Sequence, residues 1–238
     1  MIERRREGRV ELLRLDRQAV RNALDAALAA ELARAFAELG ADDAVRVVVL
    51  AGKGAGFCAG SDVKEMARVG PERRLEIARE KAALLKAMAA SPKPVVAAVH
   101  GFALGGGLML AAGCDLVVSE RDARWRLPEV GLGFFPPWGL EALVARVGVS
   151  RARLLVFGHE ELDGARALEL GLADVCVAPG AAEAEALAQA GRLAELPAAA
   201  VASSKRFFAE LAGAAELDRL AIEAYRSGGL KPPGASRI

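Results

Sequence analysis

The most informative stretch of this chain is KPVVAAVHGFALGGGLMLAAGCD, from Lys93 to Asp115. A short run typical of a buried strand leads to three consecutive glycines, and an apolar segment with helical character follows at once. Glycines at such a junction leave main-chain N–H groups open to approach at the start of a helix. In an enzyme, N–H groups of this kind stabilise a developing oxyanion. The stretch therefore predicts a strand, a glycine turn and a helix with accessible backbone donors.

Strand-like and helix-like segments alternate on both sides of this stretch. β-branched runs at 10–16 and 45–51 enclose a helical pattern at 25–39 that is closed by Gly40, which predicts a right-handed β-α-β unit. Further segments with regular patterns predict helices over 72–90, 140–147, 151–157 and 163–170, and strands over 95–99, 115–119 and 173–177. Because the composition becomes rich in Ala, Leu and Glu near residue 180, we expect an α/β core over 1–180 and a helical region over 181–238.

Composition and charge exclude several classes of protein. A chain of 238 residues with 53% hydrophobic residues can bury a sizeable core. Its 32 basic and 31 acidic residues nearly cancel, which argues against a nucleic-acid partner. No apolar run reaches the roughly 18 residues of a membrane span, and the start, MIERRREGRVE, lacks the apolar core of a signal peptide. We expect a cytoplasmic protein without a membrane partner, and its three scattered cysteines suggest no metal site.

A second glycine cluster follows the predicted strand at 45–51. Gly52, Gly54 and Gly56 suggest the fingerprint of a dinucleotide fold, but the spacing fails because Phe57 stands where that fingerprint needs a glycine. No Walker-type lysine follows either cluster. We therefore expect neither a nicotinamide or flavin cofactor nor a nucleoside triphosphate.

The two glycine loops, GKGAGFCAGSDVKE and HGFALGGG, follow consecutive parallel strands. Ligands of open parallel sheets bind at the carboxyl ends of the strands, so each loop can lend one N–H to the same oxygen. Glu129 lies downstream between an aromatic stretch and a loop rich in Pro and Gly. A carboxylate in such surroundings is desolvated, which raises its pKa and makes it a usable base. On its own, a glutamate next to proline is more often a solvated loop residue, and only its association with the two glycine loops favours the catalytic interpretation.

The segments FCAGSDVKE, KPVVAAVHGFALGGG, GCDLVVSERDARWRLPEVGLG and ALELGLADVCV together resemble the enoyl-CoA hydratase/isomerase (crotonase) superfamily over about residues 8 to 180. The resemblance implies a crotonase-like ββα superhelix with two roughly perpendicular sheets and a C-terminal helical trimerisation region. It also implies an acyl-CoA thioester substrate, a homotrimer or dimer of trimers, and no metal or redox cofactor. RNAL, at residues 21–24, resembles the family's first coenzyme A contact segment.

The same resemblance assigns site residues by position. The N–H groups of Ser61 and Gly106 would hold the thioester oxygen, and Glu129 would be the catalytic acid–base group. Trp125, Phe134 and Trp138 are expected to form the core or the wall of the acyl pocket. The residues expected to line the coenzyme A groove, together with the two N–H donors, are Arg21, Ala23, Leu24, Asp62, Val63 and Lys64.

One departure from the family pattern bears on the reaction. Hydratases of this family use two glutamates, and Met109 occupies the position of the first, two residues after the glycine triplet, beside the acyl pocket. A thioether neither activates water nor donates a proton, so efficient hydration is doubtful. Relatives with an aspartate eight residues after the PE glutamate use another mechanism, and Pro137 stands there. A single glutamate suffices for the 1,3 proton shift of a Δ3,Δ2-enoyl-CoA isomerase.

Two other interpretations remain open at the level of the sequence. The chain is either a 2-enoyl-CoA hydratase with a divergent second acid, or, in a different class, a noncatalytic scaffold that binds acyl-CoA or RNA. Retention of Glu129 argues against the scaffold, and the formal charge of +1 argues against RNA. Single-acid relatives that make or break carbon–carbon bonds are a further possibility.

Overall fold

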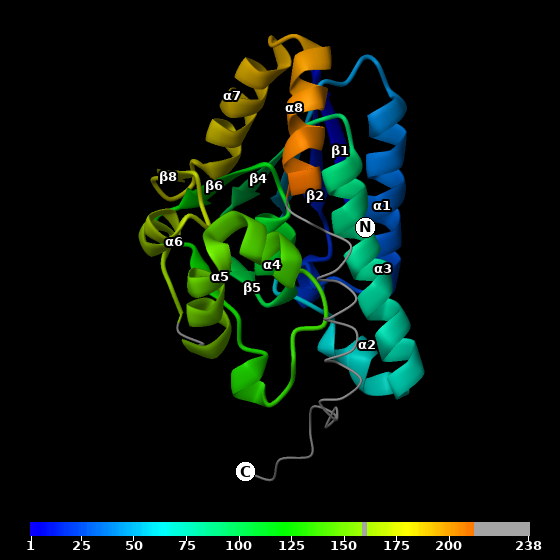
Figure 1. The fold of residues 1–238 in the computed structure, drawn as a ribbon, viewed down its shortest axis with the longest axis vertical. Helices are drawn as coiled ribbons and strands as arrows, with labels where there is room; N and C mark the ends of the chain where they lie inside the picture. The colour runs from blue at the N-terminus through cyan, green and yellow to red at the C-terminus, as the bar shows by residue number, and fades with distance from the viewer. Residues whose placement is uncertain (159–160, 212–238) are drawn as a thin grey trace.

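The structure is a computed structural model that describes residues 1–158 and 161–211. Its main sheet has six strands in the order β1-β2-β3-β4-β6-β8, in which β1 and β2 are antiparallel and all other neighbours are parallel (Figure 1). A small second sheet pairs β5 with β7 in parallel. The strands are β1 Ile2–Glu7, β2 Val10–Leu15, β3 Val47–Gly52, β4 Val95–Val99, β5 Phe102–Leu104, β6 Leu116–Glu120, β7 Arg124–Arg126 and β8 Val175–Val177.

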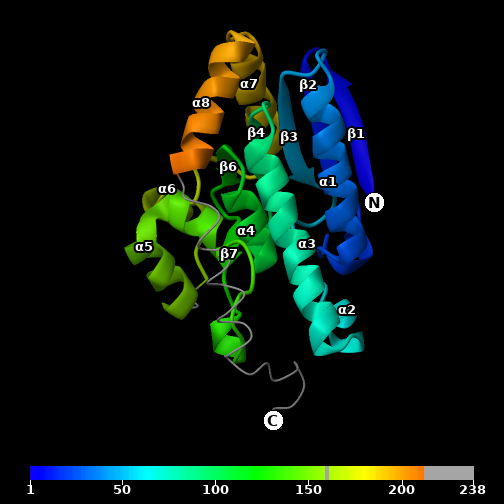
Figure 2. The same ribbon diagram turned by 45° about the vertical axis from the view of Figure 1, so that its right-hand side comes forward.

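Helices cover both faces of the main sheet. The α-helices are α1 Ala26–Ala41, α2 Val63–Arg68, α3 Pro71–Ala90, α4 Gly106–Ala112, α5 Leu140–Gly158, α6 Gly164–Leu170, α7 Ala182–Ala194 and α8 Ala198–Leu211. Two 3-10 turns, η1 Gln18–Val20 and η2 Val130–Leu132, lie in the loops. Both views show α1 and α3 side by side (Figures 1 and 2). The predicted α/β class is confirmed.

The core is divided by the sheet into two apolar clusters. The larger one lies between the sheet and α1, α3, α4 and α5. On the other face, α7 presents an alanine at every fourth position, so that Ala182, Ala186, Ala190 and Ala194 form one buried stripe against β2, β3, β4 and β6. Strands covered on both faces are apolar throughout, and every residue of β3 and β4 is indeed buried.

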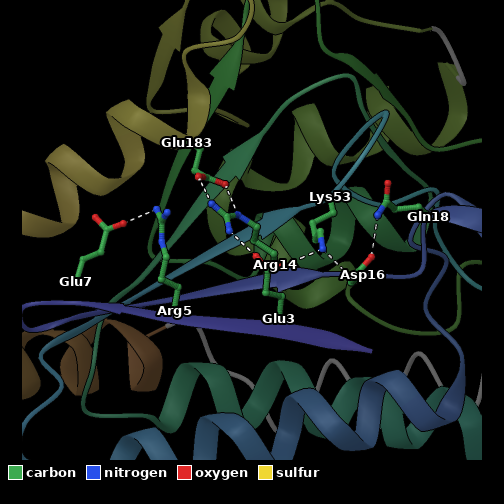
Figure 3. Close-up of polar contacts among 8 residues, drawn as sticks. All are labelled: Glu3, Arg5, Glu7, Arg14, Asp16, Gln18, Lys53 and Glu183. Carbon is green, nitrogen blue, oxygen red and sulfur yellow. Dashed lines mark hydrogen bonds and ion pairs between the residues drawn. The ribbon is translucent and has the colours of Figure 1, made fainter.

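Ion pairs secure the edge of the sheet and connect it to α7. Arg14 on β2 pairs with Glu3 on β1 at 2.5 Å and with Glu183 on α7 at 2.6 Å (Figure 3). Lys53 pairs with Glu3 at 2.9 Å and with Asp16 at 2.7 Å. These cations lower the pKa of Glu3, and Arg14 lowers the pKa of Glu183. Because these side chains are partly or fully exposed, solvent screens the pairs and each contributes little to stability.

The structure differs from the sequence predictions in several places. β1 (IERRRE) was not predicted because its run of charged side chains shows no alternation of apolar and polar residues. Its strand conformation comes from antiparallel pairing with β2. Gly40 does not end α1, which continues to Ala41. The two helices predicted at 140–147 and 151–157 are both present within α5, where the non-helical backbone of Gly148 separates them. None of the helices in the described part of the chain has the length and apolar character needed to cross a membrane.

Candidate active site

Three parallel segments end side by side, and this arrangement assembles the site. Cys58 bridges to Ala103 of β5, and β5 pairs with β7 so that Leu104 lies opposite Arg126. Beyond these segments the chain continues into 59–61, 105–107 and 127–129, respectively. Because the carboxyl ends of parallel strands meet at one edge, the two glycine loops and Glu129 converge there. A hydrogen bond from Gly105 N–H to the Arg126 carbonyl, 2.8 Å, ties the triplet to the segment that carries Glu129.

The N–H groups of Ser61 and Gly106 lie close together. A Cβ on Gly106 would be 3.3 Å from Ser61 N, and a Cβ on Gly60 would be 3.2 Å from Gly106 N. Within the described residues neither N–H donates a hydrogen bond. Gly105 takes φ +50° to make the turn into α4, a conformation that glycine adopts without strain. Two neighbouring N–H groups without partners can together hold one oxyanion.

The carboxyl of Glu129 lies against Gly105, the residue before the Gly106 donor. A Cβ on Gly105 would come within 2.6 Å of Glu129 Oε1, so the carboxyl occupies space that only a glycine leaves free. Oε2 is buried and, among the described residues, has no hydrogen-bond partner. Burial raises the pKa of Glu129 from 4.5 to about 7. A carboxyl with such a pKa can take up and return a proton near neutral pH.

Met109 and Trp138 close the space beside the donors. Met109 is 1% exposed, and a Cβ on Gly139 would lie 2.5 Å from Met109 Cβ. The indole of Trp138 covers Gly106, since a Cβ there would be 2.5 Å from Trp138 Cζ2. Both side chains are apolar and buried, and they keep water away from the space beside the donors.

The RNAL segment packs beside the first glycine loop, as the resemblance implied. Leu24 N–H donates to the Gly60 carbonyl at 2.7 Å, and Asp62 N–H donates to the Leu24 carbonyl at 3.1 Å. Arg21 accepts at its carbonyl from Ala59 N–H, and its side chain is exposed. The structure therefore brings the two segments predicted to line the coenzyme A groove together.

The first turn of α2 completes this part of the site. The side chain of Asp62 accepts from the N–H groups of Lys64 and Glu65 and so caps the helix. Its pKa is lowered despite burial, because these hydrogen bonds and Arg17 favour the ionised form. Asp62 is thus held in a capping role, whereas Val63 and Lys64 are exposed. Exposed residues on this rim can reach a bound nucleotide.

The other predicted residues lie in different surroundings. Trp125 is fully buried on β7, where its indole N–H donates to Ser119 Oγ at 3.0 Å. Phe134 is half-buried, and its N–H closes the loop by donating to the Glu129 carbonyl at 3.0 Å. His100 Nε2 forms a hydrogen bond with the Gly54 carbonyl at 2.9 Å. No group of His, Cys, Asp or Glu in the described ranges is arranged to hold a metal ion.

Two features of the site were missed by the sequence reasoning. Asn22 is buried inside the RNAL segment, and its amide donates to the carbonyls of Lys53 and Gly56, which fixes the loop before the first donor. Lys81 is buried on α3 with its Nζ over the ring of Trp138, 6.0 Å from the centroid. The sequence did contain a signal for Lys81, because this lysine lies at helical spacing among the apolar residues of α3 and is therefore expected on its buried face.

Comparisons with known proteins agree with this geometry. Residues 5–226 match the family model described as enoyl-CoA hydratase/isomerase. A probable enoyl-CoA hydratase of Rhizobium meliloti is 39% identical over 203 residues, which is 82% of this chain and 77% of that protein. The 2,3-dehydroadipyl-CoA hydratase of Escherichia coli is also 39% identical, over 70% of this chain and 65% of its own length, slightly under two thirds.

Solved structures extend the likeness to the whole fold. An enoyl-CoA hydratase/isomerase from Mycobacterium paratuberculosis superposes with a TM-score of 0.87 at 29% identity, covering 97% of this chain and 94% of the other. An enoyl-CoA hydratase from Mycobacterium smegmatis gives a TM-score of 0.83 at 35% identity, covering 94% and 89%. The chain therefore belongs to the enoyl-CoA hydratase/isomerase family of acyl-CoA enzymes.

Proposed function

We propose that this enzyme catalyses the 1,3 proton shift that converts a 3-enoyl-CoA into a 2-enoyl-CoA. The N–H groups of Ser61 and Gly106 hold the thioester oxygen, and ionised Glu129 removes a proton from the α-carbon. The resulting dienolate carries its charge on that oxygen, where the two donors stabilise it. The same carboxyl then returns the proton to the γ-carbon, so no second acid and no water take part.

The observation that carries this proposal is the contrast between Glu129 and Met109. Glu129 has a desolvated carboxyl with its pKa raised to about 7, which suits it to both halves of the shift. Met109, where a hydratase would carry its other glutamate, is 1% exposed and covered by Gly139. Hydration needs one group to activate water and another to protonate carbon. A buried thioether supplies neither function.

The coenzyme A moiety would lie over the paired RNAL and FCAGSD segments. Arg21 and Lys64 are both exposed on that rim and can pair with phosphates. The chemistry described uses no metal and no redox cofactor. The expected homotrimer or dimer of trimers is supported by exposed aromatic side chains: Phe157 on α5 is 69% exposed, and Phe207 and Phe208 on α8 are 61% and 64% exposed. Light scattering on the purified protein measures this assembly.

The relatives with hydratase names favour a second candidate, hydration of a 2-enoyl-CoA. The two reactions are separated by incubating the protein with 3-hexenoyl-CoA and, independently, with 2-hexenoyl-CoA while the absorbance of the conjugated thioester is followed. An isomerase creates this absorbance from the 3-enoyl substrate. A hydratase removes it from the 2-enoyl substrate.

Glu129→Gln should lower the isomerisation rate about 10²- to 10⁴-fold, the usual contribution of a positioned acid–base group. Glu169→Gln is the matched control, because Glu169 is exposed on α6 and pairs there with Arg166. Rapid loss of 2-hexenoyl absorbance without isomerisation would establish the hydratase instead. Binding of both thioesters without turnover would favour the noncatalytic scaffold.

A further inference from the structure

Lys81 is a buried cation that the proposed reaction does not use. It lies on the core-facing stripe of α3, whose other members are Ile77, Ala78, Leu84, Leu85 and Met88. The side chain is 1% exposed, and burial lowers its pKa to about 8. At pH 7 the ammonium is therefore still mostly charged. A buried charge in an apolar stripe costs stability unless something pairs with it.

The described residues supply no such pairing. Nζ of Lys81 has no hydrogen bond and no ion pair among them, and it lies over the ring of Trp138, 6.0 Å from the centroid. Glu65, Asp25 and Asp62 are the carboxylates that influence Lys81 most, yet all three lie beyond ion-pair distance.

Each of these carboxylates is already engaged. Glu65 accepts from Ala26 N–H at 3.1 Å, and Asp25 caps α1 by accepting from Leu28 N–H. Asp25 and Asp62 both pair with Arg17, at 2.8 and 3.2 Å. These carboxylates therefore neutralise Arg17 and cap the starts of α1 and α2. No carboxylate in the described part of the chain lies within hydrogen-bond distance of Lys81 Nζ.

Trp138 connects Lys81 to the catalytic donors. The edge of its indole ring covers Gly106, and the face of the same ring carries Nζ of Lys81 at 6.0 Å from the centroid. An acyl group whose carbonyl oxygen is held by Ser61 and Gly106 would extend along this ring. A short acyl chain is long enough to bring its far end to the ammonium.

We propose that the acyl pocket selects acyl groups that end in a carboxylate, with Lys81 as the cation that pairs with it. This inference rests on the proposed placement of the thioester at Ser61 and Gly106. A terminal carboxylate would give Lys81 the ion-pair partner that residues 1–158 and 161–211 do not supply, whereas a plain alkyl end would add none. In a desolvated pocket, a charge-assisted hydrogen bond of this kind is strong enough to decide selectivity.

Calorimetric binding of saturated acyl-CoA esters tests the proposal without turnover. Succinyl-, glutaryl- and adipoyl-CoA are compared with butyryl-, pentanoyl- and hexanoyl-CoA, so each pair has the same number of acyl carbons. At least one dicarboxylic ester should bind the wild type tenfold or more tightly than its plain partner. Lys81→Met, which keeps the side-chain volume, should remove this preference, and Lys86→Met, at an exposed position of the same helix, should keep it.

Equal or weaker binding of all three dicarboxylic esters would overturn the proposal, as would a preference that survives Lys81→Met. If the methionine variant does not fold, 6-hydroxyhexanoyl-CoA replaces it as the uncharged comparison, and the wild type must still prefer adipoyl-CoA tenfold. Isomerisation without the carboxylate preference would refute only this inference. The preference without isomerisation would refute only the proposed reaction, and failure of every ester to bind would refute both.

Discussion

Replacement of Glu129 by glutamine should increase the free energy of unfolding relative to the wild type, and this difference should grow as the pH rises from 4.5 to about 7. The pKa of Glu129 is raised from 4.5 to about 7 by burial, so between these values the folded protein keeps a proton that the unfolded chain has released. Stability contributed by this group is therefore full below pH 4.5 and is lost as the pH rises to about 7. Glutamine cannot ionise, so the variant escapes this loss.

The size of the effect follows from the pKa. At about 1.4 kcal/mol for each pKa unit, the rise corresponds to about 3 kcal/mol, and water contact at the partly exposed side chain reduces this to about 2 kcal/mol. Urea unfolding followed by the fluorescence of the buried Trp125 and Trp138 measures it for both proteins between pH 4.5 and 8. Glu169→Gln corrects for the general loss of one carboxylate.

The difference in unfolding free energy between Glu129→Gln and the wild type should grow by this amount over that range. Over the same range, kcat/KM of the wild type for isomerisation should rise and level off above about pH 7, because the base must be ionised. A difference in unfolding free energy that stays constant from pH 4.5 to 8 would show that the carboxyl is not desolvated. The raised pKa that suits Glu129 to both halves of the proton shift would then be absent.

Three further predictions concern a backbone position, an ion pair and the thiols. Gly105→Ala should lower the isomerisation rate strongly, because residue 105 has φ +50° and the added Cβ would lie 2.6 Å from the Glu129 carboxyl. Gly191→Ala in α7 is the control, because an added Cβ there would meet no atom within 4 Å. It should leave the rate unchanged and raise the unfolding free energy by about 0.5–1 kcal/mol. Arg14→Met should lower the unfolding free energy by about 1 kcal/mol at pH 7. This loss should be smaller at low pH, because Arg14 lowers the pKa of Glu183 and the ion pair no longer stabilises the fold once that carboxylate is protonated. Urea unfolding at pH 7 and at pH 4 measures the two values. Maleimide should label Cys176 in the native protein well before the two buried cysteines, as read by peptide mass spectrometry, and equal rates would contradict the burial that raises their pKa values to about 11 and 12.

Much of the architecture can be predicted from local pattern. The runs that became β3 and β4 are apolar throughout because both of their faces are covered, and such runs are recognisable without a structure. The helices predicted over 25–39 and 163–170 are found as α1 and α6, and Asp25 and Gly171 cap them in the structure. Elements of three residues, such as β5 and β7, have too little pattern to be recognised.

The sequence by itself determined the family, the two glycine loops and the retained glutamate with its missing companion at Met109. These features are strings of neighbouring residues, so their residue types and spacing are sufficient to identify them. Only the tertiary structure decided that Ser61 N, Gly106 N and the Glu129 carboxyl meet, because parallel pairing of Cys58 with β5 and of β5 with β7 sets their distances. Likewise, a lysine on a helix is ordinary in sequence, and Lys81 becomes informative because packing against Trp138 buries it without giving it an anion in the described structure.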